Sequence, residues 1–169
     1  MKQKPSERPF VESFAERAGL NKVKRSKHPR LCYLCGAITN DPHAKLKFDL
    51  AELYLKSRGD MVINPLKLNP LGTKWEDAMS YDLAIINSMK DAYLPLLKIA
   101  RFLNEDMTFF PTLVDIDPPD RQFDSPGKRL EKAIAFDVIP TVQLSIEWDN
   151  LLKQAINETE TKGNTTNEK

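Results

Sequence analysis

The segment from residue 31 to residue 64 constrains the fold more than any other part of the chain. It reads as a short apolar strand over 31–35, a helix over 41–58 and a second strand over 61–64. The helix carries an apolar stripe and stops before Gly59, a common helix terminator. A strand, a helix and a strand within about 35 residues form a βαβ unit, which requires a parallel sheet and a right-handed crossover.

The rest of the chain continues this alternation, with one ambiguous stretch. A capping box at Thr73 and Glu76 predicts another helix, and a helix from Ser125, a strand over 138–144 and a helix over 147–156 follow. Between residues 91 and 123 two interpretations remain open. Either 92–97 is the third strand, or 92–104 is helical and 107–114 is the strand, and Pro111 fits neither easily. We expect an α/β, flavodoxin-like (Rossmann-like) three-layer sandwich with a parallel sheet of about five strands.

The length and net charge of the chain limit the number of domains and the kinds of partner to be expected. The 169 residues suffice for one domain with a core but not comfortably for two, and the net charge of +1 gives no argument for a nucleic-acid partner. No apolar run reaches the roughly 18 residues of a membrane span, and no apolar signal core begins the chain. We expect a basic N-terminal extension over 1–30, a folded domain over 31–156 with an insertion at about 97–123, and a disordered tail over 157–169.

The N-terminal extension has two interpretations. Phe10, Val11, Phe14 and Ala18 can line a short amphipathic helix, followed by a basic group of residues. That group is either a loosely docked, solvated extension or a contact for nucleotide or nucleic acid. The first interpretation is favoured, and nucleic acid is an unlikely partner, because no aromatic residues are interleaved with the basic ones.

The two cysteines, Cys32 and Cys35, have the C-x-x-C spacing of some metal and redox sites. No second such pair exists, and residues three apart on a strand point to opposite faces. We therefore predict no metal site and no cofactor. Free cysteines are typical of a reducing cytoplasm.

The stretch from Ser125 to Glu131 has the features of a helix start that can hold an anion. Ser125 is a good N-cap, Pro126 suits the first helical position, and free backbone N–H groups at such an end attract anions. Gly127 and Glu131 are four residues apart and therefore share one helix face. The alternative is an ordinary capped amphipathic helix with an exposed glutamate.

Ligands of parallel α/β sheets bind at the carboxyl ends of the strands. The turn at Gly36, the loop at Asn64 and the helix start at Ser125 all fall there, and Asp82 borders the apolar stripe of the helix that follows the second strand. Two carboxylates with no required metal suit the cleavage of a glycosidic bond.

Four stretches carry a resemblance to a known family: Tyr33-Leu34-Cys35-Gly36-Ala37-Ile38-Thr39, Asn64-Pro65, Trp75-Glu76-x-x-Met79-x-x-Asp82-Leu83 and Ser125-Pro126-Gly127-Lys128-Arg129-Leu130-Glu131. In this order they resemble the nucleoside 2-deoxyribosyltransferase-like superfamily, in particular small phage and bacterial proteins of the DUF4406 type. The chain is also similar to deoxynucleoside 5′-monophosphate N-glycosidases. It departs from that pattern at Cys35 and Asn40 and in a longer segment between Asp91 and Ser125.

The resemblance implies an activity and a set of roles. Glu131 matches the nucleophile that attacks C1′, and Asp82 the acidic residue that orients the substrate and assists departure of the base. The matching substrate-binding positions are Tyr33, Gly36, Ile38, Thr39, Asn64, Ser125 and Gly127. The implied function is cleavage or transfer of the N-glycosidic bond of a nucleoside or nucleoside 5′-monophosphate. The alternative is a non-catalytic nucleotide-binding protein on the same fold.

The resemblance also implies a setting for the protein. Relatives assemble as homodimers or larger oligomers. We accordingly expect a homo-oligomer that acts on a small nucleoside or nucleotide, without a cofactor, in the cytoplasm of a bacterium or a phage-infected host.

Overall fold

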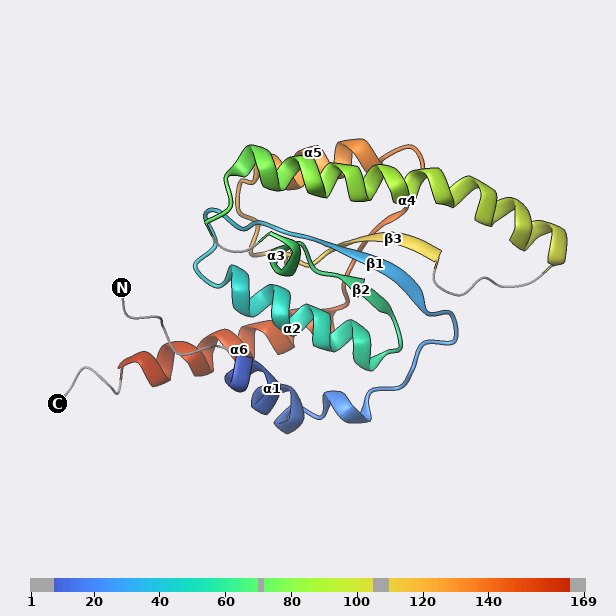
Figure 1. Cartoon of the computed structure of the whole chain (residues 1–169). Helices are drawn as coiled ribbons and strands as arrows, with labels where there is room; N and C mark the ends of the chain where they lie inside the picture. Colours follow the sequence, from blue (N-terminus) through green and yellow to red (C-terminus); the bar gives the residue numbers. More distant parts are fainter. Residues whose placement is uncertain (1–7, 70–71, 105–109, 165–169) are drawn as a thin grey trace.

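The computed structural model describes residues 8–69, 72–104 and 110–164 (Figure 1). Its sheet has four parallel strands in the order β2-β1-β3-β4. These are β1 (Arg30–Cys35), β2 (Met61–Ile63), β3 (Phe110–Asp115) and β4 (Thr141–Gln143). The expected α/β, Rossmann-like architecture is confirmed, with four strands in the described residues where about five were expected. Residues 92–97, one of the two candidates for the third strand, are helical.

Helices cover both faces of the sheet and complete the three layers (Figure 1). One face carries α4 (Trp75–Leu103) and α5 (Pro126–Ala135), and the other carries α1 (Arg8–Arg17), α2 (Ala44–Ser57) and α6 (Ile146–Asn164). The short helix α3 (Pro65–Leu68) follows β2, and a 3₁₀ turn, η1 (Leu20–Lys22), follows α1. None of the described helices is both long and apolar enough to cross a bilayer.

Successive side chains of β1 point to opposite faces of the sheet, as in any strand, and therefore belong to two separate hydrophobic cores. Cys32 and Leu34 pack with α1, α2 and α6, whereas Tyr33 and Cys35 pack with α4 and α5. The two free cysteines therefore lie on opposite faces of the sheet, as their spacing predicts.

The ambiguous stretch takes the second of its two interpretations. Helix α4 continues through Pro95 to Leu103 and ends at Asn104 in the left-handed conformation, and β3 follows; residues 107–109 of the predicted strand lie outside the described residues. Pro111 is tolerated because N–H groups alternate along β3. The N–H of Leu113 points toward β4 and that of Ile116 toward β1. The nitrogen of Pro111, two residues before Leu113, therefore also points toward β4. Because β4 pairs with β3 only from Leu113 onward, the missing N–H of Pro111 removes no bond between these strands.

The described parts of both terminal segments, residues 8–30 and 157–164, are more ordered than expected. Val11 and Phe14 on α1 are each only 1% exposed, so the N-terminal extension packs firmly on the core. Of the tail predicted to be disordered over 157–169, the part up to Asn164 is helical, and residues 165–169 lie outside the described residues. Two side-chain contacts hold this part of α6: Arg17 pairs with Glu158 at 2.7 Å, and the ring of His43 lies 3.2 Å from Glu160.

Candidate functional site

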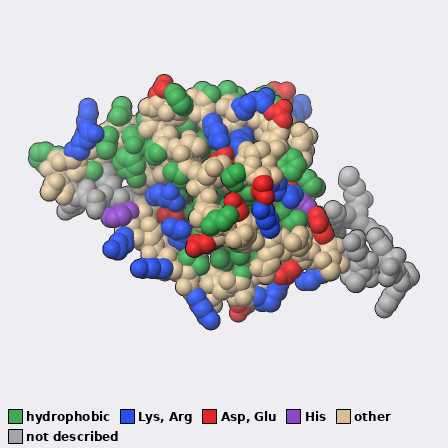
Figure 2. Space-filling view, turned by 180° about the vertical axis from the view of Figure 1, so that it is seen from behind, with side chains coloured by type: hydrophobic (Ala, Val, Ile, Leu, Met, Phe, Trp, Pro, Cys, Tyr) green, Lys and Arg blue, Asp and Glu red, His purple; other side chains and the backbone are tan. Residues whose placement is uncertain are grey.

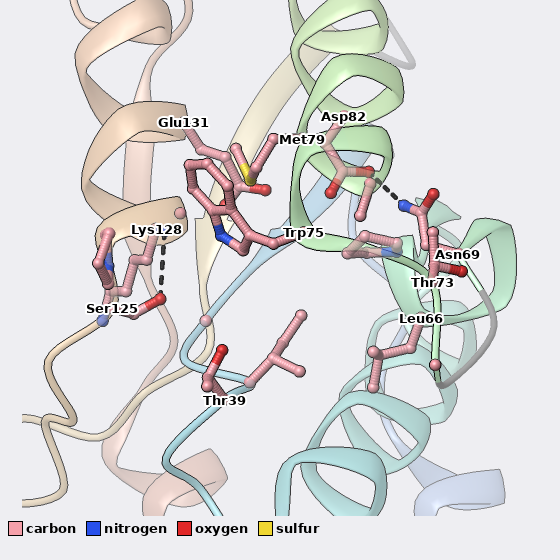
Figure 3. A pocket seen from close by; sticks show the side chains of 17 residues that line it. Thr39, Leu66, Asn69, Thr73, Trp75, Met79, Asp82, Ser125, Lys128 and Glu131 are labelled. Carbon is pink, nitrogen blue, oxygen red and sulfur yellow. Dashed lines mark hydrogen bonds between the residues drawn. The ribbon is translucent and has the colours of Figure 1, made fainter.

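A cavity of about 190 Å³ lies where β1, β2 and β3 end, between the start of α4 and the start of α5 (Figure 3). This is the expected position for a ligand site in a parallel sheet. The structure brings seven of the nine predicted site residues to its lining: Gly36, Ile38, Thr39, Asp82, Ser125, Gly127 and Glu131.

Glu131 reaches the cavity from the second turn of α5. Ser125 caps this helix, its Oγ accepting from the backbone N–H of Lys128 at 3.3 Å, and Pro126 occupies the first turn as predicted. The carboxyl of Glu131 is buried, and the hydroxyl of Tyr33 donates to its Oε1 at 2.8 Å. Burial raises the pKa of Glu131 to about 7, aided by the nearby charge of Asp82, while hydrogen bonds from Cys35 and Tyr33 oppose the rise.

Asp82 lines the cavity from α4. It is buried, and Asn69 donates from Nδ2 to its Oδ1 at 2.8 Å (Figure 3). Burial raises the pKa of Asp82, against hydrogen bonds from Asn69 and Tyr33 that favour the charged form. The Tyr33 hydroxyl donates to Glu131 and, through its proximity, also favours the charged form of Asp82. The pKa of about 7 makes Glu131 a candidate for proton transfer near neutral pH, and the raised pKa of Asp82 favours proton binding there as well.

The remaining walls are mainly apolar. Trp75 is half exposed at the mouth, and Met79 and Leu66 line the interior (Figure 3). Gly127 faces this wall closely, since a Cβ built there would lie 3.1 Å from Met79 Sδ. A flat aromatic or apolar group suits such walls, and the carboxyls at one end supply the polar contacts.

Two predicted site residues lie outside the lining. Tyr33 stands behind Glu131 and acts through it. Asn64 is buried, with Oδ1 accepting from the N–H of Leu66 at 3.1 Å as the N-cap of α3 and Nδ2 donating to Glu52 at 2.9 Å. Asn69, which sequence reasoning missed, provides the amide at the cavity instead. Its only signal in the sequence was its place in the loop that follows β2.

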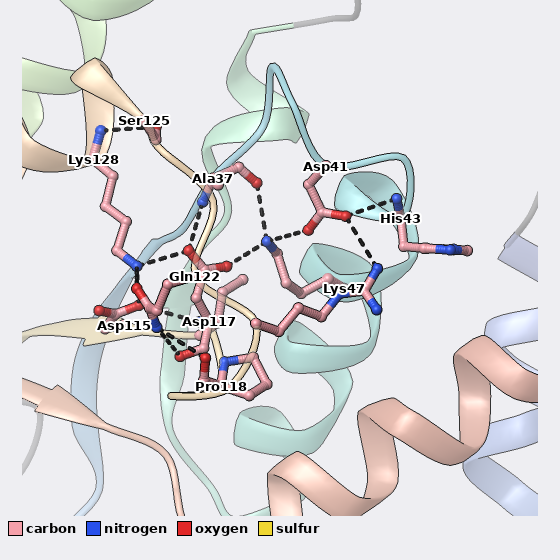
Figure 4. A network of polar contacts seen from close by, with 12 residues as sticks. Ala37, Asp41, His43, Lys47, Asp115, Asp117, Pro118, Gln122, Ser125 and Lys128 are labelled. Carbon is pink, nitrogen blue, oxygen red and sulfur yellow. Dashed lines mark hydrogen bonds and ion pairs between the residues drawn. The ribbon is translucent and has the colours of Figure 1, made fainter.

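A buried aspartate–lysine network lies beneath the cavity, comprising Asp41, Lys47, Asp115, Asp117 and Lys128 (Figure 4). The partly exposed Lys132 pairs with Asp115 at its edge. Lys47 Nζ contacts Asp41 at 2.6 Å and also pairs with Asp117, and it donates to the carbonyl of Ala37 at 3.0 Å. Lys128 Nζ lies 2.7 Å from Asp117 and 3.0 Å from Asp115. The network therefore ties the turn after β1 to α2, to the end of β3 and to the start of α5.

Two members of this network, Asp117 and Lys128, have pKa values shifted toward the ionised form. Burial alone would raise the pKa of Asp117, but Lys47 and Lys128 outweigh it and hold that pKa below its usual range. The pKa of Lys128 is likewise raised, because Asp117 and Asp115 outweigh burial. Lys128 is the one cation among the described lining residues, and its charge is already compensated. A bound phosphate would therefore depend on the backbone N–H groups at the start of α5.

Comparison with known proteins gives one finding. Residues 30–97 match a family model. Its description is "Domain of unknown function (DUF4406)", and the match supports that domain family for this segment. The DUF4406 segment runs from β1 into α4 and includes Gly36 and Asp82, whereas Ser125 and Glu131 lie beyond it. No curated protein and no solved structure matches the chain.

Two glycines of the site differ in what a side chain would meet. A Cβ on Gly36 would lie 2.9 Å from Ile116 Cγ1 and 3.2 Å from Asp117 Oδ1, both in packed surroundings. We expect Gly36→Ala to lower the free energy of unfolding by about 1–3 kcal/mol. Gly127→Ala should cost much less, because the flexible Met79 side chain can move. Urea unfolding of both variants checks this, and equal losses would contradict it.

Proposed function

We propose that the protein cleaves or transfers the N-glycosidic bond of a nucleoside, deoxynucleoside or nucleoside 5′-monophosphate, with Glu131 as the nucleophile. The observation that carries this proposal is that one cavity holds two buried carboxyls on different helices, Glu131 from α5 and Asp82 from α4 (Figure 3). The resemblance to the nucleoside 2-deoxyribosyltransferase-like superfamily implies the same two roles.

The chemistry follows from these groups. The ionised Glu131 attacks C1′, so that a C–O bond forms as the C1′–N bond breaks, and the electron pair leaves with the base. Asp82, held by Asn69, directs or supplies the proton that the departing base takes up. Water or a second base then attacks C1′ from the opposite side, gives up a proton to Asp82, and releases the Glu131 carboxylate.

A second candidate function is nucleotide binding without turnover. The observation that favours it is the burial of Glu131, which raises the pKa of its carboxyl to about 7. In the free protein this burial keeps a large share of the carboxyl in its neutral, weakly nucleophilic form near pH 7, against the hydrogen bond from Tyr33, which favours the ionised form.

The two candidates differ in whether free base appears. The protein is incubated at pH 8 with a panel of nucleosides, deoxynucleosides and their 5′-monophosphates, and base is measured by chromatography. We expect release by the wild type and a loss of about a thousandfold or more in Glu131→Gln. Glu147→Gln, which changes an exposed glutamate on α6, is the matched control and should retain full activity. Binding without release would favour the second candidate, and full activity of Glu131→Gln would contradict the mechanism.

The pH dependence gives an independent check. Because attack requires the ionised carboxyl and the pKa of Glu131 is about 7, the rate of base release should rise with pH through about 7. A rate that falls over the same range would assign Glu131 the role of a proton donor instead.

A further inference from the structure

The C-terminal half of α4 carries large apolar side chains on its outer surface. Leu94, Ile99 and Leu103 are each more than half exposed, and Phe102 is 88% exposed. This end of the helix projects past the sheet (Figure 1), and hydrophobic side chains gather on it in the space-filling view (Figure 2). It also belongs to the segment in which the sequence departs from the family pattern.

The composition of this half is that of a covered helix. Residues 92–103 contain two charged side chains, Lys98 and Arg101, and are otherwise apolar. Tyr93 packs its ring against Phe110, 4.4 Å between centroids, which accounts for the inner side. The outer side has no such cover among the described residues. A helix that is apolar nearly all round is normally buried on all sides, so a partner for the outer side is expected.

The charges on the outer side indicate which partner fits. Asp91, Leu94, Lys98 and Phe102 follow one another at helical spacing and are all exposed, so they form one stripe. Asp91 lies at the N-terminal end of the stripe, and Lys98 and Arg101 lie toward its C-terminal end. A stripe of this kind complements itself when a second copy runs in the opposite direction.

We propose that this stripe is the contact between two copies of the chain, with α4 packed antiparallel to its counterpart about a two-fold axis near residue 96. Asp91 of each copy then lies against Lys98 and Arg101 of the other, and Leu94, Ile99 and Phe102 of both copies are buried together. The same patch serves both subunits, as a two-fold contact requires. A parallel arrangement would instead set Asp91 against Asp91.

The oligomeric state of the full chain tests this contact. Sedimentation velocity over micromolar concentrations should give a dimer for the wild type. Phe102→Asp should weaken the dimer by about thirtyfold or more, because it places a charge among the apolar side chains that the contact buries. Phe136→Asp is the matched control, since Phe136 on the surface beside α5 is 81% exposed and lies outside the stripe. A monomeric wild type, or a dimer that Phe102→Asp leaves intact, would overturn the proposal.

Charge reversal tests the pairing itself. Asp91→Arg and Arg101→Asp should each weaken the dimer, because each brings like charges together. An equimolar mixture of the two variants should regain dimers of near wild-type affinity, since both reversed residues then face an opposite charge. Asp91 and Arg101 are both exposed, so the far-ultraviolet circular dichroism of the two variants should be unchanged. A mixture that dimerises no better than either variant alone would overturn the proposed pairing.

Discussion

Asp117→Asn is expected to lower the free energy of unfolding by about 3–5 kcal/mol. The carboxylate of Asp117 is buried, pairs with Lys47 and Lys128, and accepts from the N–H of Ala37 at 2.9 Å. Asparagine has nearly the same volume but no charge, so two buried ammonium groups lose a counter-ion. The variant should also loosen the turn that carries Gly36 into the cavity.

Chemical unfolding of Asp117→Asn against wild type measures this loss. Asp120→Asn is the matched control, three residues along the chain, because Asp120 is exposed and pairs with Lys153 at the surface. We expect no measurable change for the control. An Asp117→Asn protein as stable as the wild type would contradict a stabilising role for the aspartate–lysine network.

Glu131→Gln is expected to stabilise the protein at alkaline pH while it abolishes base release. The pKa of Glu131 in the folded protein is about 7, against an ordinary value of 4.5, because burial disfavours the charged form. The folded state therefore binds the proton more tightly. The tighter proton binding stabilises the folded state fully below about pH 4.5, and this stabilisation is lost as the pH rises through about 7. Glutamine carries no charge at any pH and avoids the loss, which is on the order of 3 kcal/mol.

The free energies of unfolding of the wild type and of Glu131→Gln, measured at several pH values, test whether the variant is the more stable at high pH. The two curves should lie close together at pH 4.5 and separate above pH 7, with Glu131→Gln the more stable. Glu147→Gln, at an exposed position, should follow the wild type throughout. A variant less stable than wild type at pH 8 would show that ionised Glu131 is stabilised by its surroundings. A gain in stability at the expense of activity is common when catalytic residues are replaced.

The sequence predicted what depends on local pattern. The strand–helix–strand unit, the N-cap at Ser125 and the cavity end of the sheet all follow from residues close together in the chain. Whether residues 92–104 contain a strand or a helix was left open, because Pro95 and Pro111 weaken the signals for both. Only the pairing of β3 with β1 decides it. The helical course of residues 157–164 was missed, since their composition is polar and the side-chain contacts that hold α6 join residues far apart.

Sequence reasoning was weakest for buried charge. Lys47 and Lys128 appear in helices that also bear exposed lysines, and nothing local distinguishes them from solvated residues. Their burial depends on Asp115 and Asp117, which the sequence places in an acidic, proline-rich loop. Asn64 was expected in the site because it follows a strand, yet its side chain caps α3. The amide that reaches the cavity is Asn69, in the loop that follows.

Trapping a covalent intermediate decides whether Glu131 is the nucleophile. In a 2′-fluoro nucleoside, fluorine destabilises positive charge at C1′ and so slows both the formation and the breakdown of the sugar–enzyme bond. A good leaving base offsets the slowing of the first of these steps, so that the intermediate accumulates. Intact mass spectrometry then detects any sugar bound to the protein. We predict one fluorosugar adduct per chain, on the peptide that contains Glu131, and none in Glu131→Gln. Base release by Glu131→Gln at the wild-type rate, with no adduct on the wild type, would contradict the proposed mechanism.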